Sequence, residues 1–185
     1  MRKVLFLFGQ LTDEDVEWLL ANGRPRALPA GAILIRQGAP IDAVFILLAG
    51  KLSVWLAGRE EREIARLNAG EIVGEMSFLD ARPPSATVRG VEDSTVFAIP
   101  RAGLAAKLAA DTGFAARFYR ALAIYLSTTV RERHRGLGYG AATVPTEATA
   151  ADDDDDADEL NPVLLDTVAI AGERFDRMVK RVLGD

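Results

Sequence analysis

Turn-forming residues divide the sequence between Arg24 and Pro100 into short segments, with a Gly, Pro or Asn turn every ~10 residues. The segments between the turns are apolar or alternate between apolar and polar residues. We predict strands at residues 33–36, 43–48, 52–56, 63–67, 86–91 and 95–99. Short strands at such regular spacing are typical of an antiparallel roll or sandwich. The sequence therefore predicts a mainly β fold with flanking helices, built around a β-roll of the jelly-roll type.

The segment from Gly70 to Val88, GEIVGEMSFLDARPPSATV, contains a candidate anion site. Gly74 and Glu75 follow a short apolar strand and begin a short predicted helix. The free N–H groups in the first turn of such a helix attract an anion. The Glu75 carboxylate would repel a phosphate, so it is better suited to hold a neutral hydroxyl beside the anion.

This segment resembles the phosphate-binding cassette of the cyclic-nucleotide-binding domains in catabolite activator proteins and kinase A regulatory subunits. Residues 31–40 (GAILIRQGAP) and 45–54 (FILLAGKLSV) resemble the front half of the same family's β-roll, so the resemblance extends over roughly residues 10–135. In that family the Gly-Glu pair starts a short helix, the Glu holds the ribose 2′-hydroxyl, and an Arg nine residues later holds the cyclic phosphate. Here Pro84 stands at that position, and the nearest Arg, Arg82, lies two positions earlier.

The resemblance implies a site for a cyclic nucleotide, cAMP or cGMP, which acts as an effector and needs no metal. The phosphate would lie on the amides of residues 74–77, Glu75 would hold the ribose, and the base would meet the long helix after the roll. Arg82 would replace the family Arg, because its long side chain can reach a phosphate from two positions away. The predicted site residues are Ile64, Val73, Gly74, Glu75, Met76, Ser77, Arg82, Pro84, Ser85, Ala86 and Thr87.

Three longer helices are predicted around the roll within residues 1–135, which we treat as one domain. The first has Thr12 as its N-cap and ends at Asn22, the second covers residues 101–110, and the third covers residues 113–135. The third helix carries an apolar stripe at Phe114, Phe118, Leu122, Tyr125 and Thr129. This stripe either packs on the chain's own roll or, as in the family it resembles, pairs two subunits. We predict a homodimer through this helix.

The end of the chain differs in composition from the roll. Residues 136–160 hold eight acidic residues and no Lys or Arg, which predicts an acidic disordered linker. The rest of the chain has 19 acidic against 22 basic residues, whereas the whole chain has a net charge of −5. Residues 161–185 are predicted to form an amphipathic helix, which Asn161-Pro162 would start. Its heptad-spaced apolar residues are Leu164, Val168, Ala171, Phe175, Met178 and Val182. Such a helix is expected to dock, either on the chain's own domain or on a protein partner.

The composition argues against several functions. The chain has no Cys and one His, His134, which excludes thiolate and multi-His metal sites and a Ser-His-Asp triad, so we do not expect an enzyme. One predicted helix after residue 135 is too little for a helix-turn-helix, so no DNA partner is expected. No apolar run approaches the ~20 residues of a membrane helix, and the apolar run at the N-terminus is too short for a signal peptide. We therefore expect a cytoplasmic protein with no membrane partner.

Two functions remain open. The first is a regulatory sensor that binds a cyclic nucleotide and acts through ligand-linked movement of its C-terminal helices. The second is a degenerate roll that serves as a dimerisation or protein-docking unit without nucleotide. Glu75, Ser85 and Thr87 favour the sensor. Pro84 favours the docking unit, because the absence of the guanidinium removes ~2–3 kcal/mol of charge-assisted hydrogen bonding.

Overall fold

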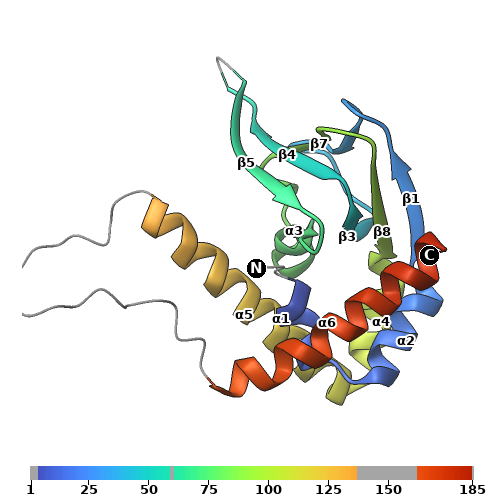
Figure 1. Cartoon of the computed structure of the whole chain (residues 1–185). Coiled ribbons are helices and arrows are strands. Elements are labelled where there is room, and N and C mark those ends of the chain that lie inside the picture. The colour runs from blue at the N-terminus through green and yellow to red at the C-terminus, as the bar shows by residue number, and fades with distance from the viewer. Residues whose placement is uncertain (1–3, 59–60, 137–161, 185) are drawn as a thin grey trace, which may run out of the picture.

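The computed structural model describes residues 4–58, 61–136 and 162–184. Its strands form two four-stranded antiparallel sheets, which together make a β-roll (Figure 1). The strand order is β1-β8-β3-β6 in the first sheet and β2-β7-β4-β5 in the second. The strands are β1 Arg24–Leu28, β2 Ile33–Ile35, β3 Ala43–Ala49, β4 Lys51–Leu56, β5 Arg62–Asn68, β6 Ile72–Val73, β7 Thr87–Gly90 and β8 Ser94–Pro100. The predicted fold class is confirmed.

The helices lie mainly on one side of the roll (Figure 1). They are α1 Val4–Gln10, α2 Asp13–Asn22, α3 Glu75–Asp80, α4 Arg101–Ala110, α5 Thr112–Gly136 and α6 Pro162–Leu183. The short α3 lies next to the roll, whereas the C-terminal end of α5 projects beyond it. Among the helices within these described ranges, none is both long and apolar enough to cross a membrane.

The strand β3 divides the apolar core into two parts. Val44, Ile46 and Leu48 face the helices, while Phe45 and Leu47 on the opposite face of the strand fill the interior of the roll. Successive side chains of a strand point to opposite faces of its sheet. A strand that is covered on both faces must therefore be apolar throughout, and this explains the unbroken apolar run of β3.

The apolar stripe of α5 packs within its own chain. Phe114, Phe118, Leu122 and Tyr125 are at most 4% exposed and belong to the core between the helices and the first sheet. The rings of Phe114 and Phe118 stack with centroids 5.6 Å apart. Of the two arrangements that the sequence left open, the structure shows packing on the chain's own roll. This face of α5 is therefore not free to form a subunit interface.

The helix α6 also docks on its own chain. It packs against α1 and α2, where Ala171, Phe175 and Met178 are at most 1% exposed and join the helical part of the core. The apolar stripe of α6 thus needs no protein partner to cover these three residues. The linker predicted at 136–160 lies outside the described residues, except for Gly136 at the end of α5.

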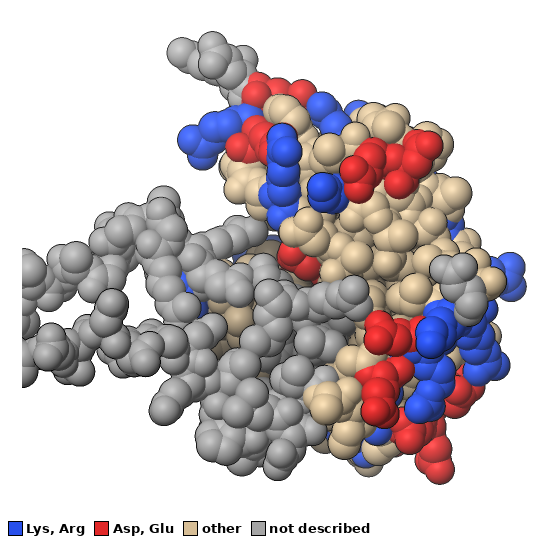
Figure 2. All heavy atoms as spheres, in the orientation of Figure 1, with Lys and Arg blue, Asp and Glu red and all other residues tan. Residues whose placement is uncertain are grey.

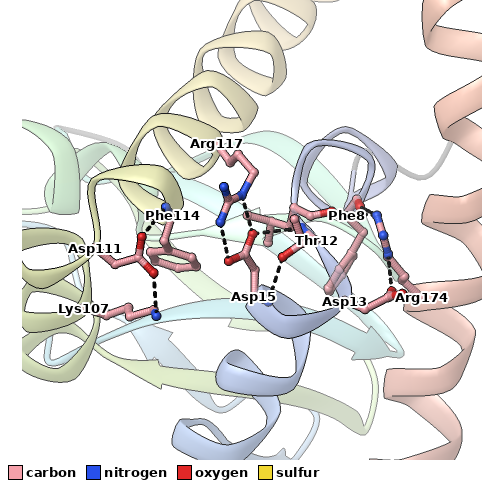
Figure 3. Close-up of polar contacts among 10 residues, drawn as sticks. Phe8, Thr12, Asp13, Asp15, Lys107, Asp111, Phe114, Arg117 and Arg174 are labelled. Carbon is pink, nitrogen blue, oxygen red and sulfur yellow. Dashed lines mark hydrogen bonds and ion pairs between the residues drawn. The ribbon is translucent and has the colours of Figure 1, made fainter.

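The start of α2 is held by an ion pair between the buried Asp15 and the half-buried Arg117 (Figure 3). Thr12 is the predicted N-cap and forms a capping box with Asp15. The Asp15 carboxylate is 3% exposed and accepts two hydrogen bonds from the Arg117 guanidinium of α5, at 2.6 and 2.8 Å. Burial raises the pKa of Asp15, but the hydrogen bonds from Arg117 and Thr12 outweigh it and hold the pKa below its ordinary value. This pair fixes α2 on α5.

Candidate functional site

The predicted turn at Gly74 is present. The strand β6 ends at Val73, and Gly74 then adopts the left-handed conformation with φ 87° and ψ 2°. A Cβ atom at this position would lie 2.9 Å from Cδ1 of Ile41, so both the backbone conformation and the available space favour glycine. The helix α3 starts at Glu75, as predicted, and ends before Ala81, which also has a positive φ of 57°.

The residues after Gly74 differ in exposure. Val73 is buried in the interior of the roll, and Glu75 is half-buried in the first turn of α3. Ser77 is 5% exposed, whereas Met76 is 56% exposed on the outer side of α3. The first turn of α3 therefore carries one half-buried carboxylate, that of Glu75.

The other end of the segment is tied to the turn between β2 and β3. Pro84 is buried, and its carbonyl accepts a hydrogen bond from the Gly38 N–H at 2.9 Å. The buried Thr87 hydroxyl accepts from the Gln37 N–H at 3.1 Å, and the Gln37 side-chain oxygen accepts from the Ala57 N–H at 2.8 Å. Pro84 therefore has a structural role in this loop in addition to replacing the family Arg.

Arg82, which was predicted to replace the family Arg, lies at the surface. Its side chain is 84% exposed, and its Nε lies 3.8 Å from the Asp80 carboxylate. The Asp80 carboxylate also accepts the Arg82 backbone N–H at 3.0 Å. The local pairing with Asp80 and the two prolines that follow hold Arg82 at the surface. In this arrangement the Arg82 guanidinium is exposed and lies near Asp80.

The remaining predicted site residues lie on the second sheet or in the loop that leads into it. Ser85 is exposed and Ala86 is half-buried in the loop before β7. Ile64 lies on the edge strand β5 and is 36% exposed. Of these three residues, Ser85 offers a hydroxyl.

Three residues of α4 and α5 hold this segment, and no sequence pattern predicted the geometry of their contacts. Arg101, the first residue of α4, donates from its guanidinium to the Ser77 carbonyl at 2.8 Å and lies over the Phe78 ring at 5.8 Å. Phe118 of α5 meets Phe78 edge-on with centroids 6.3 Å apart. The Tyr125 hydroxyl donates to the Ile72 carbonyl at 3.0 Å. The position of the long helix is thus coupled to both ends of the Gly74 turn.

Three further features bear on the chemistry. The described residues contain no group of three or more His, Cys, Asp or Glu that could hold a metal ion. A hollow of about 510 Å³ lies on the helical side, between α3, α4 and α5, and is lined mainly by apolar side chains. On the described part of the face in Figure 2, acidic and basic side chains are interspersed and form no broad basic patch.

Comparison with known proteins finds matches to the part of the chain that contains the Gly74 turn. Residues 25–111 match the family model of the cyclic nucleotide-binding domain. They belong to this family. The cyclic AMP receptor protein of Thermus thermophilus is 35% identical over 97 residues, which are 51% of this chain and 45% of that protein. The chain therefore spans less than half the length of this relative.

Two solved structures extend the comparison. The regulatory domain of Toxoplasma gondii PKA, crystallised with cAMP, is 27% identical with a TM-score of 0.52, over 57% of this chain and 42% of that one. A cyclic nucleotide-binding domain from Methylobacillus flagellatus has a TM-score of 0.66 at 24% identity, over 77% of this chain and 85% of that one, and it shows the shared fold. The cyclic nucleotide-binding domain of the present chain keeps the Gly74-Glu75 turn and carries Pro84 in the loop that follows it.

Proposed function

We propose that this chain is a regulatory protein whose roll binds a cyclic nucleotide. The observation that carries this proposal is the Gly74-Glu75 turn at the start of α3, inside a domain of the cyclic nucleotide-binding family. The Thermus relative is named for cyclic AMP, and the Toxoplasma domain was crystallised with cAMP, so cAMP is the first ligand to test. Regulation rather than catalysis is the proposed role, with the cytoplasm as its place.

The nucleotide would bind through its ribose and phosphate at the Gly74 turn. Glu75 would accept the ribose 2′-hydroxyl, and the amides of residues 74–77 together with the Ser85 hydroxyl would meet the phosphate. Since Arg82 faces solvent and Pro84 has no charge, the phosphate would be held by neutral donors. Loss of one charge-assisted hydrogen-bonded pair costs ~1.5–3 kcal/mol, so we expect affinity ~10–100-fold below that of a site with the family Arg.

A second function has a specific observation in its favour. The buried Pro84 and the outward Arg82 leave the cassette without the guanidinium of the family. A roll that no longer binds nucleotide would serve as a dimerisation or protein-docking unit.

Both functions can use α5, whose side away from the core exposes Ala116, Tyr119, Ala123 and Val130 at heptad-like spacing. We propose that a homodimer forms through this side of α5, in place of the buried Phe118 stripe.

Binding would be transmitted through the contacts around α3. A ligand at the Gly74 turn would act on Ile72 and Ser77, whose carbonyls accept hydrogen bonds from Tyr125 and Arg101. Any shift of α3 would therefore change the packing of α4 and α5. This is the proposed route for ligand-linked movement of the C-terminal helices.

Calorimetry with cAMP and cGMP tests the proposal. Wild type should bind one of them, and Glu75→Ala should weaken that binding by ~10–100-fold through loss of the ribose contact. With a 2′-deoxy analogue the same substitution should have little effect, because the hydroxyl that Glu75 holds is already missing. Glu92→Ala, an exposed acidic residue in the turn before β8, is the matched control and should leave binding unchanged. Arg82→Ala should also have little effect.

The variant Pro84→Arg separates the two functions. It restores the family residue and should tighten binding in a chain that already binds nucleotide. If wild type binds neither nucleotide while Pro84→Arg binds one, the roll has lost its ligand and the docking function replaces the sensor. If neither protein binds, the assignment of Glu75 as a ligand residue is wrong.

A further inference from the structure

The docking of α6 is built around one arginine (Figure 3). The Arg174 side chain is 13% exposed, and its Nη1 donates to the carbonyls of Phe8 at 2.8 Å and Leu11 at 2.6 Å. Its Nε donates to the Asp13 carboxylate at 2.8 Å. Carbonyls at the C-terminal end of a helix have no partner inside that helix. Arg174 therefore caps α1 and at the same time bonds to the first residue of α2.

Apolar packing accompanies this polar contact. Phe175 is 1% exposed and lies 6.2 Å from Phe8, ring centroid to centroid, and Met178 is fully buried. At the other end of the interface Arg181 pairs with Glu17 of α2 at 2.6 Å. All of α6 lies outside the residues that match the cyclic nucleotide-binding family. The docked helix is thus a feature of this chain beyond the matched domain.

A continuous set of contacts connects α6 with the Gly74 turn. The helix α6 packs on α1, and α1 packs on α5. The helix α5 reaches the Gly74 turn through the Tyr125 hydrogen bond to Ile72 and through Phe118 against Phe78. Loss of α6 would uncover Phe8 and remove the cap of α1. The support of α5 on this side would then weaken.

We propose that α6 is an intramolecular latch on the cassette. Docked α6 stabilises α1, α1 holds α5, and α5 holds the segment from Ile72 to Phe78 in its observed arrangement. Undocking of α6 and loosening of this segment are then linked, so each favours the other. The latch itself stands on the contacts alone; its effect on nucleotide affinity rests on the proposed function.

A single introduced thiol measures undocking. The chain has no Cys, so Met178→Cys gives one reactive group, placed in the interface of α6. Its rate of modification by a thiol reagent reports how often α6 leaves its site. Arg174→Ala in this background should raise the rate at least tenfold. Arg177→Ala is the matched control, because the Arg177 side chain is 51% exposed and its Nη1 lies 3.9 Å from the Asp13 carboxylate. This control should change the modification rate less than twofold.

Hydrogen exchange in the full chain without nucleotide tests the linkage. Arg174→Ala should speed exchange in the peptide covering residues 70–85 as well as in α1 and α6, while β3 and β8 keep their wild-type rates. If hydrogen exchange is accelerated equally in β3 and β8, Arg174→Ala unfolds the whole protein. The measurement is then repeated with the milder substitution Phe175→Leu. Fast exchange in α6 with wild-type rates in residues 70–85 would overturn the proposal.

Nucleotide adds a reciprocal test. Because α5 would cover the bound base, cyclic nucleotide should slow thiol modification of Met178→Cys, and Arg174→Ala should weaken nucleotide binding. Binding that is equally tight in wild type and Arg174→Ala, with no change in thiol reactivity, would refute the latch. If wild type binds no nucleotide, the proposed function fails, and hydrogen exchange alone decides about the latch.

Discussion

Replacing Phe118, a core residue of α5, by Ala should strongly lower the free energy of unfolding. The Phe118 ring is 2% exposed, stacks on Phe114 and meets Phe78 edge-on. Phe→Ala changes in a core cost ~3–5 kcal/mol, because the transfer free energy is lost and a cavity remains. We expect the upper half of this range, since three aromatic pairs, with Phe78, Phe114 and Tyr119, are lost together with the burial.

The neighbouring residue provides the matched control. Tyr119 follows Phe118 in the sequence but is 47% exposed on the other side of α5, so Tyr119→Ala should cost less than ~1 kcal/mol of folding stability. Urea unfolding followed by circular dichroism measures both. With a slope of ~2 kcal/mol per molar urea, Phe118→Ala should lower the midpoint by roughly 2 M. Light scattering on the same samples gives the mass, and Tyr119→Ala should reduce it if the proposed dimer forms.

The opposite pattern would refute the assignment of a core side and an exposed side to α5. A Phe118→Ala protein with the wild-type midpoint and half the wild-type mass would place Phe118 in a subunit interface. Equal losses of stability in both variants would mean that the two sides of α5 do not differ in burial.

Two other predictions concern acid stability and backbone strain. The pKa of Asp15 is lowered in the folded protein from its ordinary value of 3.8, because hydrogen bonds from Arg117 and Thr12 outweigh the effect of burial. The contribution of Asp15 to stability is therefore present above about pH 4 and is lost as the pH falls through the folded pKa. The urea midpoint of the Asp15→Asn variant should therefore decrease less between pH 5 and pH 3 than that of wild type. Replacing Ala81, which has φ 57°, by Gly should raise the free energy of unfolding by ~0.5–1 kcal/mol, measured by the same assay.

The sequence predicted those parts of the fold in which periodicity and turn chemistry agree. It missed β1 because Arg24, Pro25 and Arg26 are exposed, so this edge strand shows no alternation. It also missed α1, whose short apolar sequence VLFLFGQ carries no acidic first turn and no periodic polar face. This helix packs between α5 and α6, and two covered sides remove the pattern that usually identifies a helix.

The stripes of α5 and α6 were visible in the sequence, but what covers them was not. Heptad spacing shows that Phe118 and Phe175 need a cover, and it carries no information on whether that cover is the same chain or another. The structure gives the answer through Asp15–Arg117 and Arg174–Asp13, which are long-range pairs between residues more than 100 positions apart. No local sequence pattern predicts such pairs.

In the cassette, backbone shape and charge depend on different residues. Gly74 provides the left-handed turn, and the carbonyl of Pro84 accepts from the Gly38 N–H, a bond that any residue at position 84 can keep. In the proposed site, the side chain at position 84 decides whether a guanidinium faces the ligand. A chain can therefore keep the fold of the family while it loses the charge that holds a phosphate. A match in sequence and structure shows that the fold is kept. Whether the charge is kept depends on the residue at position 84, which is Pro84 here.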